Sequence, residues 1–253
     1  MIARRAAADD RDRSVLGRLS PLTKLGIAVV WLVGMALGTQ LAPPLLIAAV
    51  ALVAGVGLGG IRPGDLIRAL VPLWSVAAVV VISNIVFGAA NTDPSATEVA
   101  RIGPLRVTQE AIATATAVGA RVIAIASVGV VFALTTEPTR LVDALVQRAH
   151  VSDRFAYGAL AAYQAVPRFA DDLATLRQAR RIRGLGGAWH PRLLIGLLVL
   201  AIRHGDRVAV AMDARGFGSG PRTHYRVVHW TWGDAIAALA GVLVLGLALA
   251  MAR

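Results

Sequence analysis

The sequence predicts an all-α, polytopic membrane protein with about five transmembrane helices and a further helical region in the cytoplasm. Three observations predict this class. Of the 253 residues, 57% are hydrophobic and only 16% are charged, whereas about a quarter of the residues in a soluble domain are charged. The mean hydropathy is +0.66. Five apolar segments have the length, about 17 to 25 residues, that crosses a bilayer as a helix.

Short turns separate the first three predicted spans. Pro43 and Pro44 mark a tight turn between the first two. A polar stretch of about a hundred residues separates the fourth span from the fifth. The spans are expected at residues 25–41, 44–61, 69–90, 111–134 and 235–251. The predicted organisation is a cytoplasmic tail at 1–24, four transmembrane helices within 25–134, cytoplasmic helices over 135–233 and a final transmembrane helix at 234–253.

The basic residues predict the orientation of the chain in its membrane. Lys and Arg gather in the cytoplasmic loops of membrane proteins. Six of them lie in residues 1–24 and fourteen in residues 137–232, whereas the turn at 39–44 has none. We therefore expect the N-terminus and the long polar stretch in the cytoplasm. Residues 3–13 alternate in charge and no apolar core with a cleavage site follows them, so we expect a solvated tail there and no signal peptide.

The composition argues against a nucleic-acid-binding or metal-binding protein. The net charge is +11, but aromatic residues make up only 5% of the chain, and proteins that bind single-stranded nucleic acid combine basic with aromatic side chains. The chain has no cysteine, which excludes disulfides and thiolate metal ligands. The five histidines have no i, i+4 spacing, so we expect neither a metal site nor a bound cofactor.

Apolar spacing and helix-ending residues predict three helices in the long polar stretch. The first begins at Pro138, with Thr136 as its cap. The second runs from about 154 to 183, and the third from about 192 to 215. The apolar face expected on the second helix consists of Phe169, Leu173 and Leu176.

The second and third of these helices end in the same dipeptide, Arg183-Gly184 and Arg215-Gly216. One such pair is typical of an ordinary helix end, because arginine complements the helix dipole and glycine supplies the left-handed closing residue. Two copies present two guanidinium groups beside small residues such as Ala214, and small residues let a partner approach closely. We interpret the two stretches as docking surfaces, not as a catalytic site.

Several stretches, taken in order, resemble the transmembrane T component of energy-coupling factor transporters, the vitamin and metal-ion importers of prokaryotes. LGRLSPLTKL at 16–25 is similar to that family's L-D-P-R-T-K-L segment, with Ser20 and Leu22 in place of aspartate and arginine. ALTTEPTRLVDAL at 133–145 resembles its TT-x-P-x-x-L-x-x-A-L segment, and AVPRFADDL at 165–173 resembles its arginine-aromatic-proline region in altered order.

The two Arg-Gly stretches match the paired Ala-Arg-Gly motifs of that family. The second motif is complete at 214–216. In the first, Ile182 stands where alanine is usual, so Arg183 is the residue carried over. The Arg-Thr pair at 222–223 and Asp234 also lie where the family often has them.

The resemblance implies a non-catalytic adaptor in a prokaryotic plasma membrane. In that family, cytoplasmic coupling helices dock into grooves of two ABC-type ATPases, a homodimer or a heterodimer, and transmit ATP-driven motion to a separate substrate-binding membrane subunit, the S component. A Walker A loop needs Gly-Lys-Ser/Thr, and Lys24 is the only lysine and lacks that context. Because specificity belongs to the S component, cobalt, nickel, biotin and other vitamins all stay open as substrates. The implied ATPase-docking residues are Arg183, Gly184, Ala214, Arg215 and Gly216.

Two alternative functions are a membrane enzyme that acts on lipid phosphates and an ordinary ABC permease subunit that binds its own substrate. The cytosolic arginines could clamp phosphate in the enzyme, but no acid, base or metal constellation accompanies them. The weakly polar spans and the doubled Arg-Gly pair argue against the permease.

Three features inside the predicted spans require an interpretation. GVGLGG at 55–60 has the spacing of a dinucleotide-binding loop but lies at the end of an apolar span, so we expect close helix packing there. Arg121 is inside the fourth span, where it is either functional or satisfies helix carbonyls. Asn84 is expected to form a hydrogen bond between helices.

Overall fold

The chain divides into two compact units. The structure, a computed structural model, describes residues 14–38, 40–92, 95–102, 105–185, 190–220 and 226–251. The first unit, here the membrane unit, comprises residues 1–137 and 229–253, and the second, the polar unit, comprises residues 138–228.

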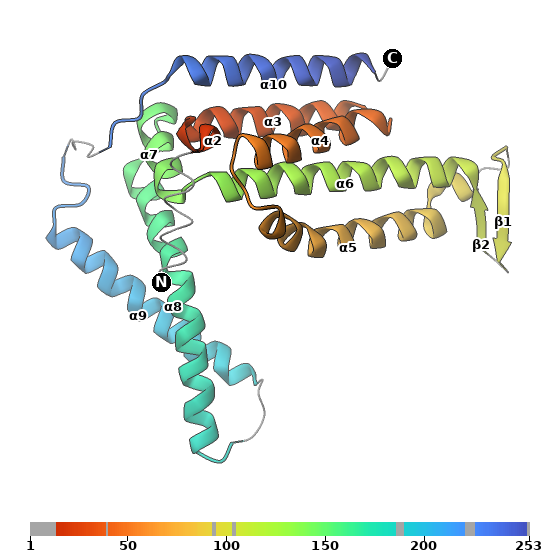
Figure 1. Cartoon of the computed structure of the whole chain (residues 1–253). Coiled ribbons are helices and arrows are strands. Elements are labelled where there is room, and N and C mark those ends of the chain that lie inside the picture. Colours follow the sequence, from red (N-terminus) through yellow and green to blue (C-terminus); the bar gives the residue numbers. More distant parts are fainter. Residues whose placement is uncertain are drawn as a thin grey trace. The chain divides into compact units, whose positions relative to one another are not determined.

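The membrane unit is built from apolar helices around α6. Prolines in the first turns of α3, α4 and α5 explain where these helices begin, because proline fits the first helical turn without losing a hydrogen bond. The short helix α2 (Val15–Arg18) precedes α3. Helix α6 (Gln109–Thr135) contacts α3 (Pro21–Leu37), α4 (Ala42–Gly57) and α5 (Pro63–Phe87), and α10 (Trp232–Ala250) packs against α3 and α4 (Figure 1).

The prediction of an all-α membrane protein is confirmed. Among the described residues, α5, α6 and α10 are long and apolar enough to cross a membrane. Helices α3 and α4 are apolar but shorter, at 17 and 16 residues. Helix α5 starts at Pro63 and not near residue 69, because Asp65 lies in its first turn, where a negative charge stabilises a helix N-terminus.

Small residues allow the membrane helices to approach closely. A Cβ atom on Gly55 would lie 2.9 Å from a Val131 methyl group of α6, and one on Gly241 would lie 2.9 Å from an Ile27 methyl group of α3. The glycine-rich stretch is therefore a packing surface at the end of α4, as expected. The larger cluster of buried side chains in this unit consists of Trp31, Met35, Ile47, Ala48, Ala51, Ala124, Val128 and Ala248.

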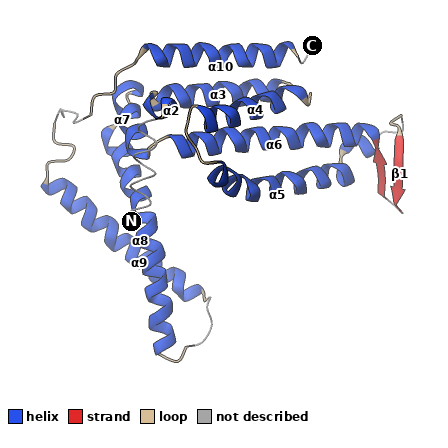
Figure 2. Cartoon of the chain, in the orientation of Figure 1, coloured by secondary structure: helices blue, strands red, loops and turns tan. Residues whose placement is uncertain are grey.

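The structure contains a β-hairpin between α5 and α6 that the sequence did not predict. Strands β1 (Glu98–Ile102) and β2 (Leu105–Thr108) pair antiparallel and are drawn in red in Figure 2. A 3₁₀ turn, η1 (Ala89–Thr92), precedes them. The Asn91 side-chain oxygen accepts hydrogen bonds from the Thr108 backbone nitrogen at 3.0 Å and from its hydroxyl at 3.1 Å. Strands of four and five residues contain too few alternating positions to be recognised from sequence.

The polar unit contains the three predicted helices, which are confirmed as α7 (Pro138–Ala149), α8 (Asp153–Ile182) and α9 (Pro191–Ala214). Helix α8 contacts both α7 and α9, and α9 crosses it (Figure 1). The predicted apolar face of α8 packs against α9. There the Phe169 ring lies edge-on to His204 at 6.2 Å between centroids, and Leu176 lies against Gly196.

Two local predictions are wrong. Thr136 does not cap α7, because α6 continues to Thr135 and Thr136 closes that helix instead. Its buried hydroxyl makes no hydrogen bond. Asn84 does not link two helices through its amide nitrogen, which donates to the Val80 carbonyl of its own helix at 2.9 Å. A carbonyl four residues earlier is within easy reach of such a short side chain.

Candidate functional site

Helix α8 ends in a Schellman closure at Arg183 and Gly184. The Leu185 backbone nitrogen donates to the Arg180 carbonyl at 3.1 Å, and the Gly184 nitrogen donates to the Arg181 carbonyl at 3.0 Å. Gly184 has a φ of +72°, in the left-handed region that glycine adopts most easily. We call residues 180–185 the α8 tip.

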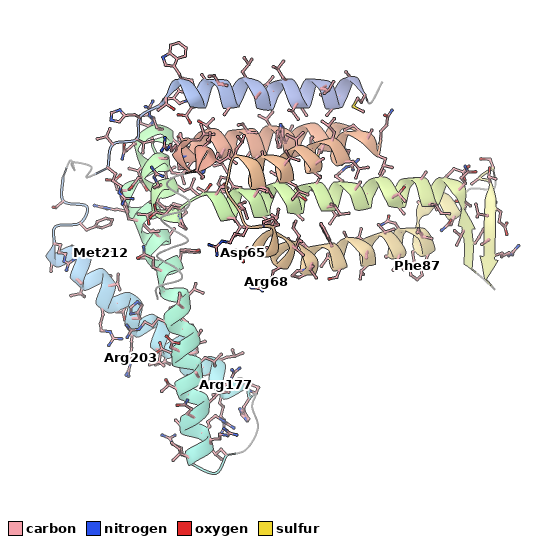
Figure 3. The ribbon with its side chains drawn as sticks, viewed as in Figure 1. Asp65, Arg68, Phe87, Arg177, Arg203 and Met212 are labelled. Atoms are coloured by element: carbon pink, nitrogen blue, oxygen red, sulfur yellow. The ribbon has the colours of Figure 1, made fainter. Side chains whose placement is uncertain are left out.

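Helix α9 ends in the same closure at Arg215 and Gly216. The Phe217 backbone nitrogen donates to the Met212 carbonyl at 3.0 Å, and the Gly216 nitrogen donates to the Asp213 carbonyl at 2.8 Å. Gly216 has a φ of +71°. Figure 3 labels Met212 at this end of the helix. We call residues 212–217 the α9 tip; its two closing hydrogen bonds and its left-handed glycine correspond to those of the α8 tip.

Both arginines of the candidate site are exposed at these tips. Arg183 and Arg215 occupy the same capping position of the two closures. Ile182 is 86% exposed, and Ala214, at the equivalent position, is also exposed. The five predicted docking residues are therefore at the surface or half-buried, as an interaction with another protein requires.

The first turns of α8 brace the α9 tip. Arg154 Nη2 donates to the Gly218 carbonyl at 3.0 Å. The Tyr157 ring meets the Phe217 ring edge-on, with 6.5 Å between centroids. The Tyr157 hydroxyl donates to Asp143 Oδ1 of α7 at 2.8 Å, so the α9 tip, α8 and α7 are connected through one tyrosine.

Helix α7 is in turn connected to the segment that leads into α10. Gln147 Nε2 donates to the Arg226 carbonyl at 2.7 Å, and Gln147 Oε1 accepts from the Val228 backbone nitrogen at 2.9 Å. Arg148 Nη2 also donates to the Val228 carbonyl at 3.2 Å. Side chains of α7 therefore hold the backbone of residues 226–228, where the polar unit ends.

Two cations in the membrane unit satisfy helix carbonyls. Lys24 of α3 is buried, and its Nζ donates to the Thr135 carbonyl at the end of α6 at 2.9 Å. Arg121 of α6 donates through Nη2 to the Gly38 carbonyl at the end of α3. Each cation therefore lies at the C-terminus of the other helix, where the partial charge is negative. This favours the structural interpretation of Arg121.

Some sequence-predicted positions lie outside the described residues or apart from the tips. The Arg222-Thr223 pair falls outside the described residues. Asp234 belongs to the membrane unit, where it caps α10. In the part of the chain that the structure describes, no group of three His, Asp or Glu side chains is arranged to hold a metal ion.

The residues that brace the α9 tip carry no recognisable signal in the sequence. Arg154 and Tyr157 lie about sixty positions before the tip they contact, and neither belongs to a recognisable motif. Gln147, which holds the segment at 226–228, is also missed. Only a pattern of covariation between these positions would have indicated the contacts.

The comparisons with known proteins agree on one family. A family model described as cobalt transport protein (CbiQ) matches residues 12–225. The energy-coupling factor transporter transmembrane protein EcfT of Lacticaseibacillus paracasei is 28% identical over 246 residues, which is 90% of each chain. EcfT of Limosilactobacillus fermentum is 30% identical over 168 residues, 60% of this chain and 62% of that protein. The match therefore spans about three fifths of this second relative.

A third relative is of a different kind. A putative ABC transporter ATP-binding protein of Bifidobacterium longum is 26% identical over 172 residues. The match covers 61% of this chain but only 22% of that protein. A segment similar to this chain therefore occurs within a much longer polypeptide.

Proposed function

This chain belongs to the cobalt transport protein (CbiQ) family, and we propose that it acts as the transmembrane T component of an energy-coupling factor importer. In this role it transmits ATP-driven motion of two cytosolic ABC-type ATPases to a separate membrane subunit that binds the substrate. The chain itself is not an enzyme, and ATP is hydrolysed by its partners. The substrate class is a vitamin or a transition-metal ion.

The observation that carries this proposal is the repeated helix end in the polar unit. Two helices close with corresponding hydrogen bonds and the same left-handed glycine, and each closure exposes its capping arginine, Arg183 or Arg215. A guanidinium group reaches carboxylates as a planar fork with several donors. Two equivalent tips suit a pair of ATPase subunits, one tip in the groove of each.

The five docking residues have distinct roles in this proposal. Arg183 and Arg215 enter the two grooves and bind acidic or carbonyl groups there. Gly184 and Gly216 turn the chain sharply away from the helix axis, so that the helix end itself reaches the partner. Ala214 keeps the helix surface beside Arg215 small enough for close approach.

The relative from Bifidobacterium longum supports ATPase partners. Its printed name is an ATP-binding protein, and a segment of it is similar to this chain. When two functions share one polypeptide in one organism, their separate counterparts in another are candidates to bind each other. This argument concerns the class of partner and leaves its stoichiometry to experiment.

In this proposal, the contacts that brace the α9 tip transmit its movement through α8 and α7 towards α10. A movement of the α9 tip displaces Phe217, which packs on Tyr157, and Tyr157 is hydrogen-bonded to Asp143 of α7. Helix α7 holds Val228 through Gln147, and the chain enters α10 at Trp232, four residues later. Packed elements of this kind pass displacement on because close-packed interiors deform little.

The orientation follows from the distribution of charge. Residues 137–232 hold fourteen of the 26 basic residues, and Lys and Arg near membrane spans are enriched on the cytoplasmic side of a plasma membrane. The N-terminus, with its own basic residues, lies on the same side. Both tips then face the compartment that contains ATP.

The proposal is tested by co-purification in detergent with candidate ABC ATPases of the same genome. The wild-type chain is compared with the Arg183→Glu, Arg215→Glu double variant. The matched control, Arg168→Glu with Arg203→Glu, makes the same change in charge at exposed positions of α8 and α9 away from the tips. Figure 3 labels Arg203 on α9.

We expect the wild type and the control to capture the ATPases and the tip variant to lose them by more than about tenfold, because a reversed charge in a carboxylate groove costs several kcal/mol. Size-exclusion profiles check that all three proteins are folded. Capture by none of them, with folding intact, contradicts the proposal. Turnover of a lipid phosphate by the purified chain alone would then support the membrane enzyme instead.

A further inference from the structure

The membrane unit contains an apolar cavity of about 510 Å³ beside the first half of α10. Helices α2, α3, α4, α6 and α10, which are drawn together in Figure 1, all contribute to its walls. The volume lies in the range of about 300–1,000 Å³ that is usual for ligand pockets. None of the five candidate docking residues lines it, so the cavity is separate from the two tips.

Two hydrogen bonds hold α10 against α3 on either side of the cavity. At the start of α10, Asp234 accepts from the Ser20 backbone nitrogen at 2.6 Å. Further along, Trp31 Nε1 donates to the Gly241 carbonyl at 2.8 Å. Between these two points α10 turns Ala237 towards the cavity. A side chain of one methyl group leaves space there that the neighbouring helices do not fill.

The cavity is about as deep as one leaflet of a bilayer. On α10 its lining extends from Gly233 to Val244, which is about 16 Å along a helix. The hydrocarbon of one leaflet is about 15 Å thick. The polar side chains Lys24 and Thr135 line one end, where Lys24 Nζ donates to the Thr135 carbonyl at 2.9 Å. The cavity therefore has the polarity of half a membrane, polar at one end and apolar beyond it.

The polar end of the cavity is open to the surroundings. The lining residues Val15, Leu58 and Ile236 are 59%, 51% and 67% exposed. They belong to α2, the end of α4 and the start of α10. The Leu16 backbone nitrogen donates to the Leu58 carbonyl at 3.1 Å, which fixes α2 beside this opening. A molecule in the surrounding membrane can therefore enter next to α2.

The charges at the opening are positive. Lys24 lines the cavity, and Arg18 is exposed in the same short helix as Val15. Among the described residues, no Asp or Glu side chain lines the cavity. Basic side chains near a membrane surface attract anionic lipids. The opening is thus complementary to a negatively charged headgroup.

We propose that the cavity binds one acyl chain of an anionic phospholipid, with the phosphate beside Arg18. In the proposed orientation this lipid belongs to the cytoplasmic leaflet, which is rich in anionic lipids. Water is a poor occupant, because it needs two to four polar partners. A helix of another protein is about 10–12 Å across with its side chains, too wide for a cavity of this volume and depth.

Trp31 provides a direct measurement, because it lines the cavity and is only 8% exposed. The probe is phosphatidylglycerol with brominated acyl chains, since bromine quenches tryptophan fluorescence at close range. The chain has five tryptophans, so one protein retains Trp31 alone and a second retains Trp74 alone, with phenylalanine at the others. Trp74 lies on α5 and is 40% exposed, so it reports the lipid that surrounds the protein.

Two variants obstruct the cavity from different helices. Ala237→Phe on α10 and Ala54→Phe on α4 each place a ring in the space that the chain would occupy. The matched control is Ala250→Phe, at an exposed position of α10 that does not line the cavity. Quenching of Trp74 in each background checks that the protein is inserted in the vesicle.

We expect brominated phosphatidylglycerol to lower Trp31 emission by about half or more, because a chain in the cavity is in van der Waals contact with the ring. Either obstructing variant should remove most of this quenching, and the control should retain it. Trp74 should be quenched equally throughout. Unquenched Trp31 in the unobstructed protein overturns the inference. So does quenching that both obstructing variants leave intact, since it then comes from lipid outside the cavity.

The headgroup is tested in the unobstructed protein, so this measurement does not depend on the folding of the obstructing variants. Half-maximal quenching of Trp31 should need about threefold to fivefold less brominated phosphatidylglycerol than brominated phosphatidylcholine. Arg18→Gln should reduce this preference to below about twofold. Arg68→Gln, at an exposed arginine on α5 that Figure 3 labels, should retain it. Equal quenching by the two lipids in the unobstructed protein overturns the anionic headgroup and with it the proposal.

This inference rests on the membrane unit alone and does not need the ATPases. If Trp31 is quenched as expected but no ATPase is captured, the lipid site stands and the proposed function fails. If the ATPases are captured but Trp31 is not quenched, only the lipid site is wrong.

Discussion

Asp234 accepts a hydrogen bond from the Ser20 backbone nitrogen at 2.6 Å, although the two residues are 214 positions apart. Its second carboxylate oxygen accepts from the Thr231 backbone nitrogen at 2.8 Å and from the Thr231 hydroxyl at 2.9 Å. The Asp234 side chain is fully buried. One carboxylate therefore joins the start of α3 to the start of α10 and caps the latter.

We expect Asp234→Ala to destabilise the membrane unit. The change leaves the Ser20 and Thr231 nitrogens without their acceptor, and a buried unsatisfied donor costs about 1–3 kcal/mol. Thermal unfolding in detergent measures the effect as a lower Tm. Asp206→Ala, an exposed carboxylate on α9, is the control and should leave Tm unchanged. Equal shifts in the two variants would contradict the assignment.

Lys24→Met is expected to loosen the contact between α3 and α6. The ammonium group donates to the Thr135 carbonyl at the end of α6, and methionine retains the volume but not the donor. Loss of a charged hydrogen bond of this kind costs about 1.5–3 kcal/mol. Arg18→Met, an exposed cation on α2, provides the comparison in the same unfolding measurement. A Tm drop no larger than that of the control would mean that the buried contact contributes nothing.

Replacing glycine with alanine should lower stability at one pair of glycines and raise it at another pair. Gly184→Ala and Gly216→Ala place a Cβ atom at a φ of about +70°, which costs about 1–2 kcal/mol. Gly158→Ala and Gly205→Ala lie inside α8 and α9 with open space around a new Cβ atom, so alanine should stabilise them by about 0.5–1 kcal/mol. Amide hydrogen exchange at the helix ends measures both effects. The same sign in both pairs would show that the tips are not held in the closure described.

The helix ends were predictable from the sequence because they are local. An arginine followed by glycine after an amphipathic run determines the closure within six residues, and the hydrogen bonds of the tips at Gly184 and Gly216 follow that expectation. The apolar helices were predictable for the same reason, since length and hydropathy suffice. The role of the five candidate docking residues stays a prediction, because it depends on the surface of another protein.

The long-range contacts were not predictable. Nothing in a single sequence connects Ser20 to Asp234 or Lys24 to Thr135, because each pair is separated by more than a hundred residues. The sequence allows two interpretations of Arg121, and its donation to the Gly38 carbonyl favours the structural one. The bracing of the α9 tip by Tyr157 is of the same kind. Pairings of this type depend on which helices pack together, and apolar periodicity alone does not determine that.

A change at Tyr157 should distinguish binding of the ATPases from transmission of their movement. Tyr157→Phe keeps the ring that packs on Phe217 but removes the hydroxyl that donates to Asp143. Because the tip and its arginine are unchanged, ATPase capture should stay within about twofold of the wild type, whereas loss of one hydrogen bond worth about 1 kcal/mol between α8 and α7 should lower uptake per ATP hydrolysed several-fold. Uptake and ATP hydrolysis are measured together in vesicles that hold the full complex. Tyr163→Phe, at an exposed tyrosine of the same helix, should leave both rates unchanged. If Tyr157→Phe lowers capture and uptake in equal proportion, the tyrosine supports the tip itself and does not transmit its movement.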